Sequence, residues 1–325
     1  ELEPALDEHL IEIVQRTQGH AGWPLNVFLT PEGYPLLGMT YVPTEKFRQL
    51  LVRLNQLWIE QPEEAAAMAQ GGMQALTRQR QPKTPDSLVS TRQLQADFVS
   101  SAMRHAKQMQ GGFGQINQFP MPAQLSLLLE LHASKADGAL AEFLVLTLDQ
   151  MASKGLRDQL AGGFYRYTVD PGWHTPHYEK MLYTQALLSD LYMRAADVLK
   201  RPDYLLVAAD TLNFVLRYMR GKSGAYIASF SAVAGNDVEG GYYLWSREEL
   251  ARVLEGDLLE FALEHWNLKS SPDSMSLPML GRGIPDLASA SGRSEKQVKE
   301  LLQQARQRLL AARADRVLPV DNKEL

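Results

Sequence analysis

The sequence predicts a mainly α-helical protein that is preceded by a small α/β segment. After residue 90, apolar residues recur at the spacing of amphipathic helices, and no strand-like alternation of comparable length interrupts them. Before residue 60, a helical period is followed by two short runs of strand-forming residues and by a second helical period, in the order α-β-β-α. These two patterns define the predicted fold class.

The elements of the first segment follow from local signals. Its first helix has apolar residues at helical spacing, namely Leu6, Leu10, Ile13 and Val14. We expect this helix to end at Gly19, because glycine readily adopts the left-handed conformation that closes helices. Residues 25–30 and 34–42 are rich in strand formers and flank the turn residues 31–33, which predicts a β-hairpin. A last helix is predicted from Thr44 onward.

Residues 61–90 are polar and contain several prolines, so they are predicted to be a linker. The expected boundaries are therefore 1–60 for the α/β segment, 61–90 for the linker and 91–325 for the helical domain. Both ends of the chain resemble cuts, since it starts at Glu1 and stops at Leu325 without a cap or turn, and we expect a longer natural protein.

A double-glycine turn followed by an aromatic residue occurs three times between the predicted helices. The three copies are Gly111-Gly112-Phe113-Gly114, Gly162-Gly163-Phe164-Tyr165 and Gly240-Gly241-Tyr242-Tyr243. Their recurrence indicates a repeating helical-hairpin architecture, with the aromatic rings facing one shared cavity. The alternative is that the glycines cap helices and that the aromatic rings fill the core.

The composition excludes several classes of function. The formal net charge is −5 and no basic face is apparent, so we expect no nucleic-acid partner. No apolar run reaches the roughly 20 residues of a membrane helix, so we expect no membrane partner and favour the cytoplasm. The chain contains no cysteine and therefore has no thiol for disulfide exchange or for metal binding.

Residues 157–183 are the densest source of chemically active side chains. This non-periodic loop contains two histidines, two arginines, the acids Asp170 and Glu179 and several aromatic residues. Histidine exchanges protons near neutral pH, a carboxylate can orient it, and aromatic faces suit the apolar side of a sugar ring. The alternative is a structural loop held by charge pairs such as Arg166 with Asp170. We expect no metal and no cofactor, because Pro176 separates His174 from His177 in a way that disfavours a helical ligand face.

Four motifs in this order resemble the spermatogenesis-associated thioredoxin-containing family. They are residues 22–33 with 40–43, residues 111–114, residues 158–164, and Pro176-His177-Tyr178-Glu179-Lys180-Met181-Leu182-Tyr183. The resemblance covers nearly the whole chain. It implies the C-terminal half of a thioredoxin-like α/β domain, followed by an incomplete α/α toroid of the six-hairpin type seen in N-acylglucosamine 2-epimerase. It also implies a cis bond between Trp23 and Pro24, and a Cys-x-x-Cys upstream of Glu1.

Two segments depart from the family pattern. Residues 115–120 lack the usual lysine before Phe119 and Pro120, and residues 229–236 lack the usual acidic Asp-Ala-Asp-Ser run. Only the motif from Pro176 to Tyr183 is essentially intact. These losses in the implied pocket cast doubt on catalysis by this family member.

The first functional hypothesis is a carbohydrate-active enzyme of isomerase or hydrolase type. His177 would be the general acid or base, Glu179 would orient it, and Arg166 would hold a substrate oxygen. The substrate-binding rings would be Phe113, Phe164, Tyr165, Trp173, Tyr183 and Tyr243. The partner would be a small sugar-like ligand. The alternative is a non-catalytic protein that binds a partner chain through the toroid cavity or the thioredoxin-like surface; redox activity would require upstream cysteines in a longer chain.

His177 is expected at the N-terminus of a helix that begins near Glu179. The positive end of the helix dipole would disfavour the imidazolium and keep the ring neutral, as a general base requires.

Overall fold

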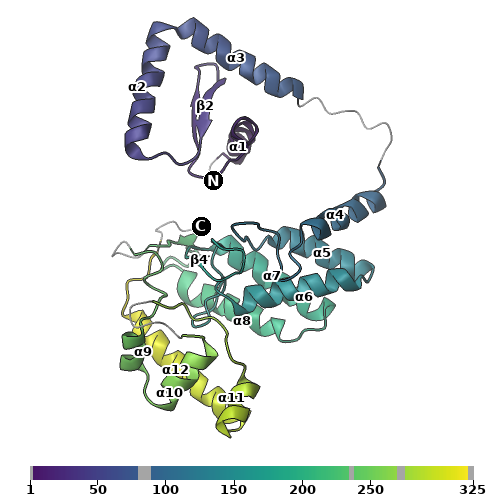
Figure 1. Ribbon diagram of the computed structural model, residues 1–325, viewed down its shortest axis with the longest axis vertical. Helices are drawn as coiled ribbons and strands as arrows, with labels where there is room; N and C mark the ends of the chain where they lie inside the picture. Colours follow the sequence, from purple (N-terminus) through teal and green to yellow (C-terminus); the bar gives the residue numbers. More distant parts are fainter. Residues whose placement is uncertain (1–2, 80–88, 234–237, 269–274, 321–325) are drawn as a thin grey trace. The chain divides into compact units, whose positions relative to one another are not determined.

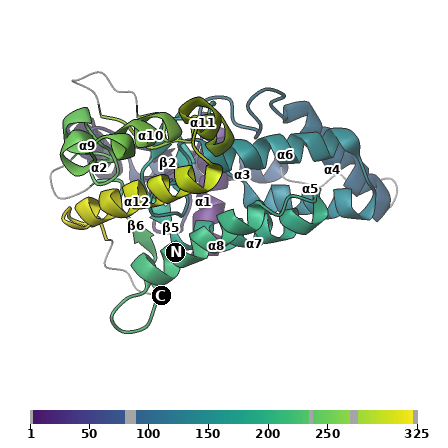
Figure 2. The same cartoon turned by 90° about the horizontal axis from the view of Figure 1, so that it is seen from below.

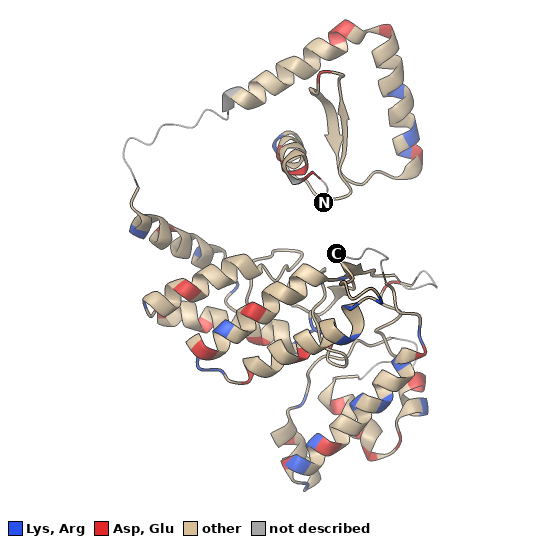
Figure 3. Ribbon diagram, turned by 180° about the vertical axis from the view of Figure 1, so that it is seen from behind, with Lys and Arg blue, Asp and Glu red and all other residues tan. Residues whose placement is uncertain are grey.

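The computed structural model describes residues 3–79, 89–233, 238–268 and 275–320. The chain forms two compact units, Glu1–Val89 and Ser90–Leu325 (Figure 1). In both units, acidic and basic residues are scattered over the helices (Figure 3).

The first unit has the α-β-β-α order that its sequence predicts, followed by one further helix. Its elements are α1 (Pro4–Gln18), β1 (Asn26–Leu29), β2 (Pro35–Met39), α2 (Thr44–Glu60) and α3 (Pro62–Gln79). Helix α1 ends as predicted at Gly19, which has a φ of 78° and donates its N–H to the carbonyl of Gln15. β1 and β2 are antiparallel, and the Trp23–Pro24 bond between α1 and β1 is cis, which confirms that prediction.

Most of the predicted linker is instead helix α3. Ala65 and Ala69 lie four residues apart, so they share one helix face, and both are buried. This face packs against β2. The helix also contains several glutamine and glutamate residues, so its sequence is polar enough to be taken for a linker. Residues 80–88 of the predicted linker lie outside the described residues.

The second unit is mainly helical, as its sequence predicts. Its elements are α4 (Thr91–His105), α5 (Pro122–Ser134), α6 (Gly138–Ser153), β3 (Tyr167–Thr168), β4 (Pro176–His177), β5 (Lys180–Met181), α7 (Leu182–Val198), α8 (Tyr204–Phe214), the π-helix η1 (Val215–Met219), β6 (Ser229–Phe230), α9 (Arg247–Val253), α10 (Asp257–His265), α11 (Ile284–Ser291) and α12 (Glu295–Ala314). Helices α5, α6, α7 and α8 lie side by side as two successive hairpins (Figure 2). Such hairpins are the building unit of the incomplete α/α toroid, and the mainly α fold class is confirmed.

The double glycines serve backbone conformation and close packing. Both glycines of the first two turns and the first glycine of the third have positive φ values between 68° and 82°. The rings that follow them do not share a cavity. Phe113 and Phe164 belong to the core of α5–α8, whereas Tyr242 and Tyr243 pack in a separate cluster near Tyr178. The shared-cavity prediction is therefore wrong, and the rings fill the core.

A Gly163→Ala substitution tests this explanation. The new Cβ would lie 2.6 Å from the Phe214 ring, and the residue would have to keep a φ of 75°. We expect a loss of roughly 1–3 kcal/mol in the free energy of unfolding. The matched control is Gly138→Ala at the start of α6, where a Cβ has nothing within 4 Å. The control should be neutral or slightly stabilising in urea denaturation, and equal stabilities for the two variants would refute the packing explanation.

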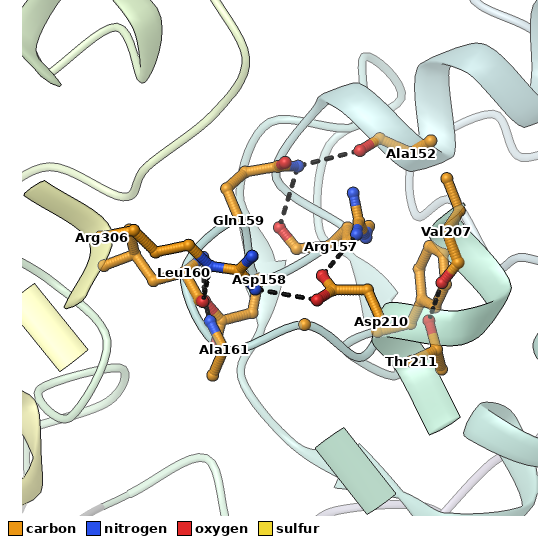
Figure 4. A network of polar contacts seen from close by, with 12 residues as sticks. Ala152, Arg157, Asp158, Gln159, Leu160, Ala161, Val207, Asp210, Thr211 and Arg306 are labelled. Carbon is orange, nitrogen blue, oxygen red and sulfur yellow. Dashed lines mark hydrogen bonds and ion pairs between the residues drawn. The ribbon is translucent and has the colours of Figure 1, made fainter. Parts of the chain in front are cut away.

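A charged network holds the loop after α6 against α8 and α12 (Figure 4). The Asp210 carboxylate of α8 accepts from Arg157 at 2.7 Å and from Arg306 of α12 at 2.9 Å. Arg306 also donates to the carbonyl of Leu160 at 2.5 Å. The loop that supplies the candidate site is thereby fixed at its N-terminal end.

Candidate functional site

The site is built on a short hairpin within the loop between α6 and α7. β3 and β4 pair antiparallel, with Tyr167 opposite His177. The hairpin tip is held by Asp170, whose carboxylate accepts from three backbone N–H groups, those of Gly172, His174 and Thr175. These bonds, acting against burial, lower the pKa of Asp170. Asp170 therefore shapes the turn and does not face His177.

His177 lies between two carboxylates. Its Nδ1 is 3.0 Å from Oε1 of Glu239, and its Nε2 is 3.3 Å from Oε2 of Glu179. Arg166 donates to the same Glu179 oxygen at 2.9 Å and has Tyr183 as a neighbour. The His177 and Glu179 side chains are about a quarter to a third exposed, and that of Glu239 is half exposed. The structure thus brings the three predicted catalytic residues together at the surface.

The two carboxylates favour the charged imidazole. The hydrogen bond that His177 donates to Glu179 is the main cause that raises the pKa of His177; burial opposes it and Glu239 adds to it. The pKa of Glu179 is lowered, chiefly by its bond to His177 and also by Arg166, against the effect of burial. The cluster therefore favours the protonated imidazole, which can give a proton, beside carboxylates that can take one.

The predicted position of His177 at a helix N-terminus is wrong. His177 belongs to strand β4, Lys180–Met181 form strand β5, and α7 begins only at Leu182. The helix dipole acts only near the first turn, so it does not keep this ring neutral. His177 was expected to be neutral, but its surroundings stabilise the protonated form and raise its pKa.

Replacing Glu239 with Gln should lower the pKa of His177, because it removes one of the two charges that favour the imidazolium. The measurement is an NMR pH titration of the imidazole, with Glu248→Gln, an exposed acid in α9, as the control. Because the folded-state pKa lies above the unfolded value, the stabilisation by this group is complete below about pH 6.5 and is lost as pH rises through the folded pKa. A wild-type pKa at or below 6.5 would contradict this account.

A second charged cluster is buried beneath the site. Lys180 donates to Asp158 at 3.0 Å, and Arg313 donates to the same Asp158 oxygen at 2.8 Å. Tyr165 and Tyr243, predicted to bind substrate, instead surround the Lys180 ammonium, at 5.0 and 5.1 Å from their ring centres. All five side chains are at most 1% exposed. Tyr165 and Tyr243 present no ring face to solvent and therefore do not belong to the candidate site.

The other predicted ring-binding residues divide by exposure. Phe164 is buried and stacks on Tyr192, and Trp173 is buried and donates its indole N–H to the carbonyl of Gln110. Phe113 is half-buried and packs against Phe143 in the core. Only Tyr183, at 55% exposure, stands beside Arg166 where a ligand could reach it. The rings of Phe113, Phe164 and Trp173 therefore contribute their apolar area to the core and not to a ligand site.

Two site residues were not found from the sequence. Glu239 lies 62 residues from His177, so no local spacing could connect them. The one signal was its place directly before the third double glycine. The ring of Tyr167 lies 5.1 Å from that of His177 because the two residues face each other across the hairpin. In the segment 229–236, where the family acids are missing, residues 234–236 lie outside the described residues.

Among the described residues, no group of three or more His, Asp or Glu side chains could hold a metal ion. Within the same ranges, no helix is long and apolar enough to cross a membrane.

Sequence comparisons place the chain among known proteins. A family model for a thioredoxin-like DsbH domain, described as a protein of unknown function (DUF255), matches residues 1–77. Spermatogenesis-associated protein 20 of Homo sapiens is 32% identical over 79% of this chain and 35% of its own length. The Mus musculus protein of the same name is 29% identical over 99% of this chain and 46% of its own. The chain thus spans less than half the length of these relatives.

Solved structures with partial similarity include sugar epimerases. A sugar epimerase from a ruminal bacterium has a TM-score of 0.40 and 13% identity, covering 66% of this chain and 52% of that one. The cellobiose 2-epimerase from Spirochaeta thermophila has a TM-score of 0.36 and 18% identity, covering 43% of this chain and 40% of that one.

Proposed function

This chain is related to the spermatogenesis-associated thioredoxin-containing family, and we propose that its second unit is an acid–base enzyme that acts on a carbohydrate-like small molecule. The observation that carries the proposal is the solvent-accessible His177 between Glu179 and Glu239. A histidine in contact with two carboxylates offers a proton donor and a proton acceptor within the reach of one small molecule.

The four side chains would take different roles. Glu179 is held by Arg166, so it would orient His177 through Nε2 and stay in place. Glu239 is half exposed and has more freedom to move away from Nδ1. A substrate oxygen would enter between His177 and Glu239 and accept the Nδ1 proton, and Glu239 would take the proton from the neighbouring carbon. Arg166 would thus act through Glu179 and not as the direct oxygen ligand expected from the sequence.

We favour isomerisation over hydrolysis. His177 and its carboxylates are only 3.0–3.3 Å apart. That spacing suits neighbouring atoms of one α-hydroxy carbonyl group, where one proton leaves carbon as another reaches the carbonyl oxygen. Hydrolysis with inversion needs an acid and a base separated by roughly 6.5–9.5 Å, so that a water fits between them. The resulting enediol would regain a proton at carbon to give an epimer or a ketose.

The test is to incubate the protein with reducing sugars in D2O and to follow the signals by NMR. Isomerisation predicts deuterium at the carbon next to the carbonyl, together with an epimer or ketose product. Release of reducing ends from methyl glycosides without this exchange would replace the isomerase by a hydrolase. If neither reaction occurs with aldoses, ketoses or disaccharides, the enzyme proposal fails and the non-catalytic binding protein takes its place.

A further inference from the structure

Tyr178 stands between the site residues His177 and Glu179 in the sequence, but it faces the interior. Tyr178 is 7% exposed, whereas the side chains of His177 and Glu179 are 27% and 29% exposed. The Tyr178 ring stacks on Tyr243 with centres 5.9 Å apart, and it packs edge-on against Tyr165 at 5.5 Å. The ring is therefore held in place by the buried tyrosine cluster beneath the site.

Gly240 lies directly against the Tyr178 ring. A Cβ added to Gly240 would lie 2.6 Å from two atoms of this ring and 2.8 Å from a third. Gly240 also has a φ of 73°, a conformation that glycine adopts readily and other residues rarely adopt. Because the ring is packed on its other sides, a side chain at position 240 would push the backbone of Gly240 away from it.

The turn that begins at Gly240 is fixed by hydrogen bonds. The N–H of Gly240 donates to the carbonyl of Ala232 at 2.8 Å, and the carbonyl of Gly240 accepts from two N–H groups of the turn at 2.8 and 3.0 Å. The guanidinium of Arg316 donates to three further carbonyls within residues 241–244. A displacement of Gly240 is therefore not absorbed within the turn and is passed to Glu239, which directly precedes it.

We propose that the contact between Gly240 and the Tyr178 ring positions Glu239 on His177, so that Tyr178 is a positioning residue for the acid–base group. Two adjacent residues of one segment meet two adjacent residues of the other: Gly240 meets Tyr178, and Oε1 of Glu239 is 3.0 Å from Nδ1 of His177. Consecutive Cα atoms are about 3.8 Å apart, so a shift of Gly240 away from the ring also moves Glu239 away from the imidazole. The effect on turnover rests on the proposed function, whereas the placement of Glu239 can be measured without a substrate.

The pKa of His177, followed by NMR pH titration, reports the position of Glu239. Glu239→Gln gives the reference shift. Gly240→Ala should lower the pKa in the same direction and by no more than this reference, because it weakens the same interaction between the carboxylate and the imidazolium. The matched control is Gly224→Ala. Gly224 also has a positive φ, of 93°, but a Cβ there has nothing within 4 Å, so the control adds backbone strain without the contact and should leave the pKa unchanged.

Variants of Tyr178 test the other side of the contact and decide the question if Gly240→Ala does not fold. Tyr178→Phe keeps the ring and should retain the raised pKa of His177, whereas Tyr178→Leu removes the ring face and should lower this pKa. In the Glu239→Gln background, neither Gly240→Ala nor Tyr178→Leu should shift the pKa further, because both act through Glu239. This background separates an effect through Glu239 from one through the neighbouring Glu179.

The outcomes separate this proposal from the proposed function. The expected pattern of pKa values supports the positioning role of Tyr178 even if no sugar is turned over. Turnover that depends on His177, combined with a His177 pKa that is indifferent to Gly240→Ala and Tyr178→Leu, overturns the positioning role and leaves the enzyme. The positioning role is also overturned if Glu239→Gln itself leaves the pKa unchanged, or if the shifts persist in the Glu239→Gln background.

Discussion

Replacing Asp158 with Asn is expected to lower the free energy of unfolding by about 3–5 kcal/mol, because it leaves two buried cations without their counter-ion. One Asp158 oxygen accepts from Lys180 and Arg313, and the other accepts from the backbone N–H groups of Leu160 and Ala161. Although burial acts to raise it, Arg313 and Lys180 hold the pKa of this carboxyl well below its usual range. The native state therefore favours the ionised carboxylate.

Lys180 limits the cost of the substitution. Burial outweighs the attraction of Asp158 and lowers the pKa of Lys180 to about 8, and the neighbouring Arg313 cation adds to this effect. Without Asp158, Lys180 can lose its proton and leave only Arg313 charged. Lys180→Met should consequently cost less than Asp158→Asn, since it keeps the pair between Asp158 and Arg313.

Urea denaturation with a matched surface variant checks the expectation. Asp190 of α7 forms an exposed pair with Arg194 at 3.7 Å, and Asp190→Asn should change stability by less than about 1 kcal/mol. A similarly small effect of Asp158→Asn would show that the buried cluster does not need its carboxylate. Since the folded-state pKa of Asp158 is depressed, its contribution is present above the unfolded value and is lost as pH falls toward the folded one.

Local signals predicted the elements but not their exact faces. The glycine cap of α1 and the β1–β2 hairpin were predictable, because a few neighbouring residues determine them. In α8, Leu205 and Leu212 lie seven residues apart on an apolar but exposed face, and the buried face contains Tyr204, Ala208 and Phe214. Helix α8 is apolar almost all round, so periodicity alone could not select the side that contacts α7.

The site was predictable only as far as it is local in sequence. His177 and Glu179 are two residues apart, and Arg166 reaches Glu179 through the hairpin within the same loop. The aromatic residues could not be sorted, because a ring that fills the core and a ring that binds a ligand have the same sequence signal. Burial divides them: Trp173 is enclosed, whereas Tyr183 is exposed.

Replacing His177 with Gln is expected to reduce turnover by about 10²–10⁴-fold, the usual contribution of a general acid or base. Glutamine can keep a hydrogen bond to one of the two carboxylates but cannot transfer a proton. Stability should change by less than about 1 kcal/mol, since the contacts of His177 are partly exposed. The single-turnover rate and the melting temperature are therefore measured together.

His174→Gln is the matched control for this experiment. His174 lies three residues earlier on the same hairpin and is 3.3 Å from a carboxylate of its own, Asp170, but it does not contact Glu179 or Glu239. If proton transfer by His177 is the function of the cluster, only His177→Gln loses activity, and Glu239→Gln loses it as well. An early-melting His177→Gln that keeps its rate per folded molecule would instead make His177 a residue that supports the hairpin. The distinction follows from geometry: a supporting residue needs only its contacts, whereas an acid–base residue also needs its proton.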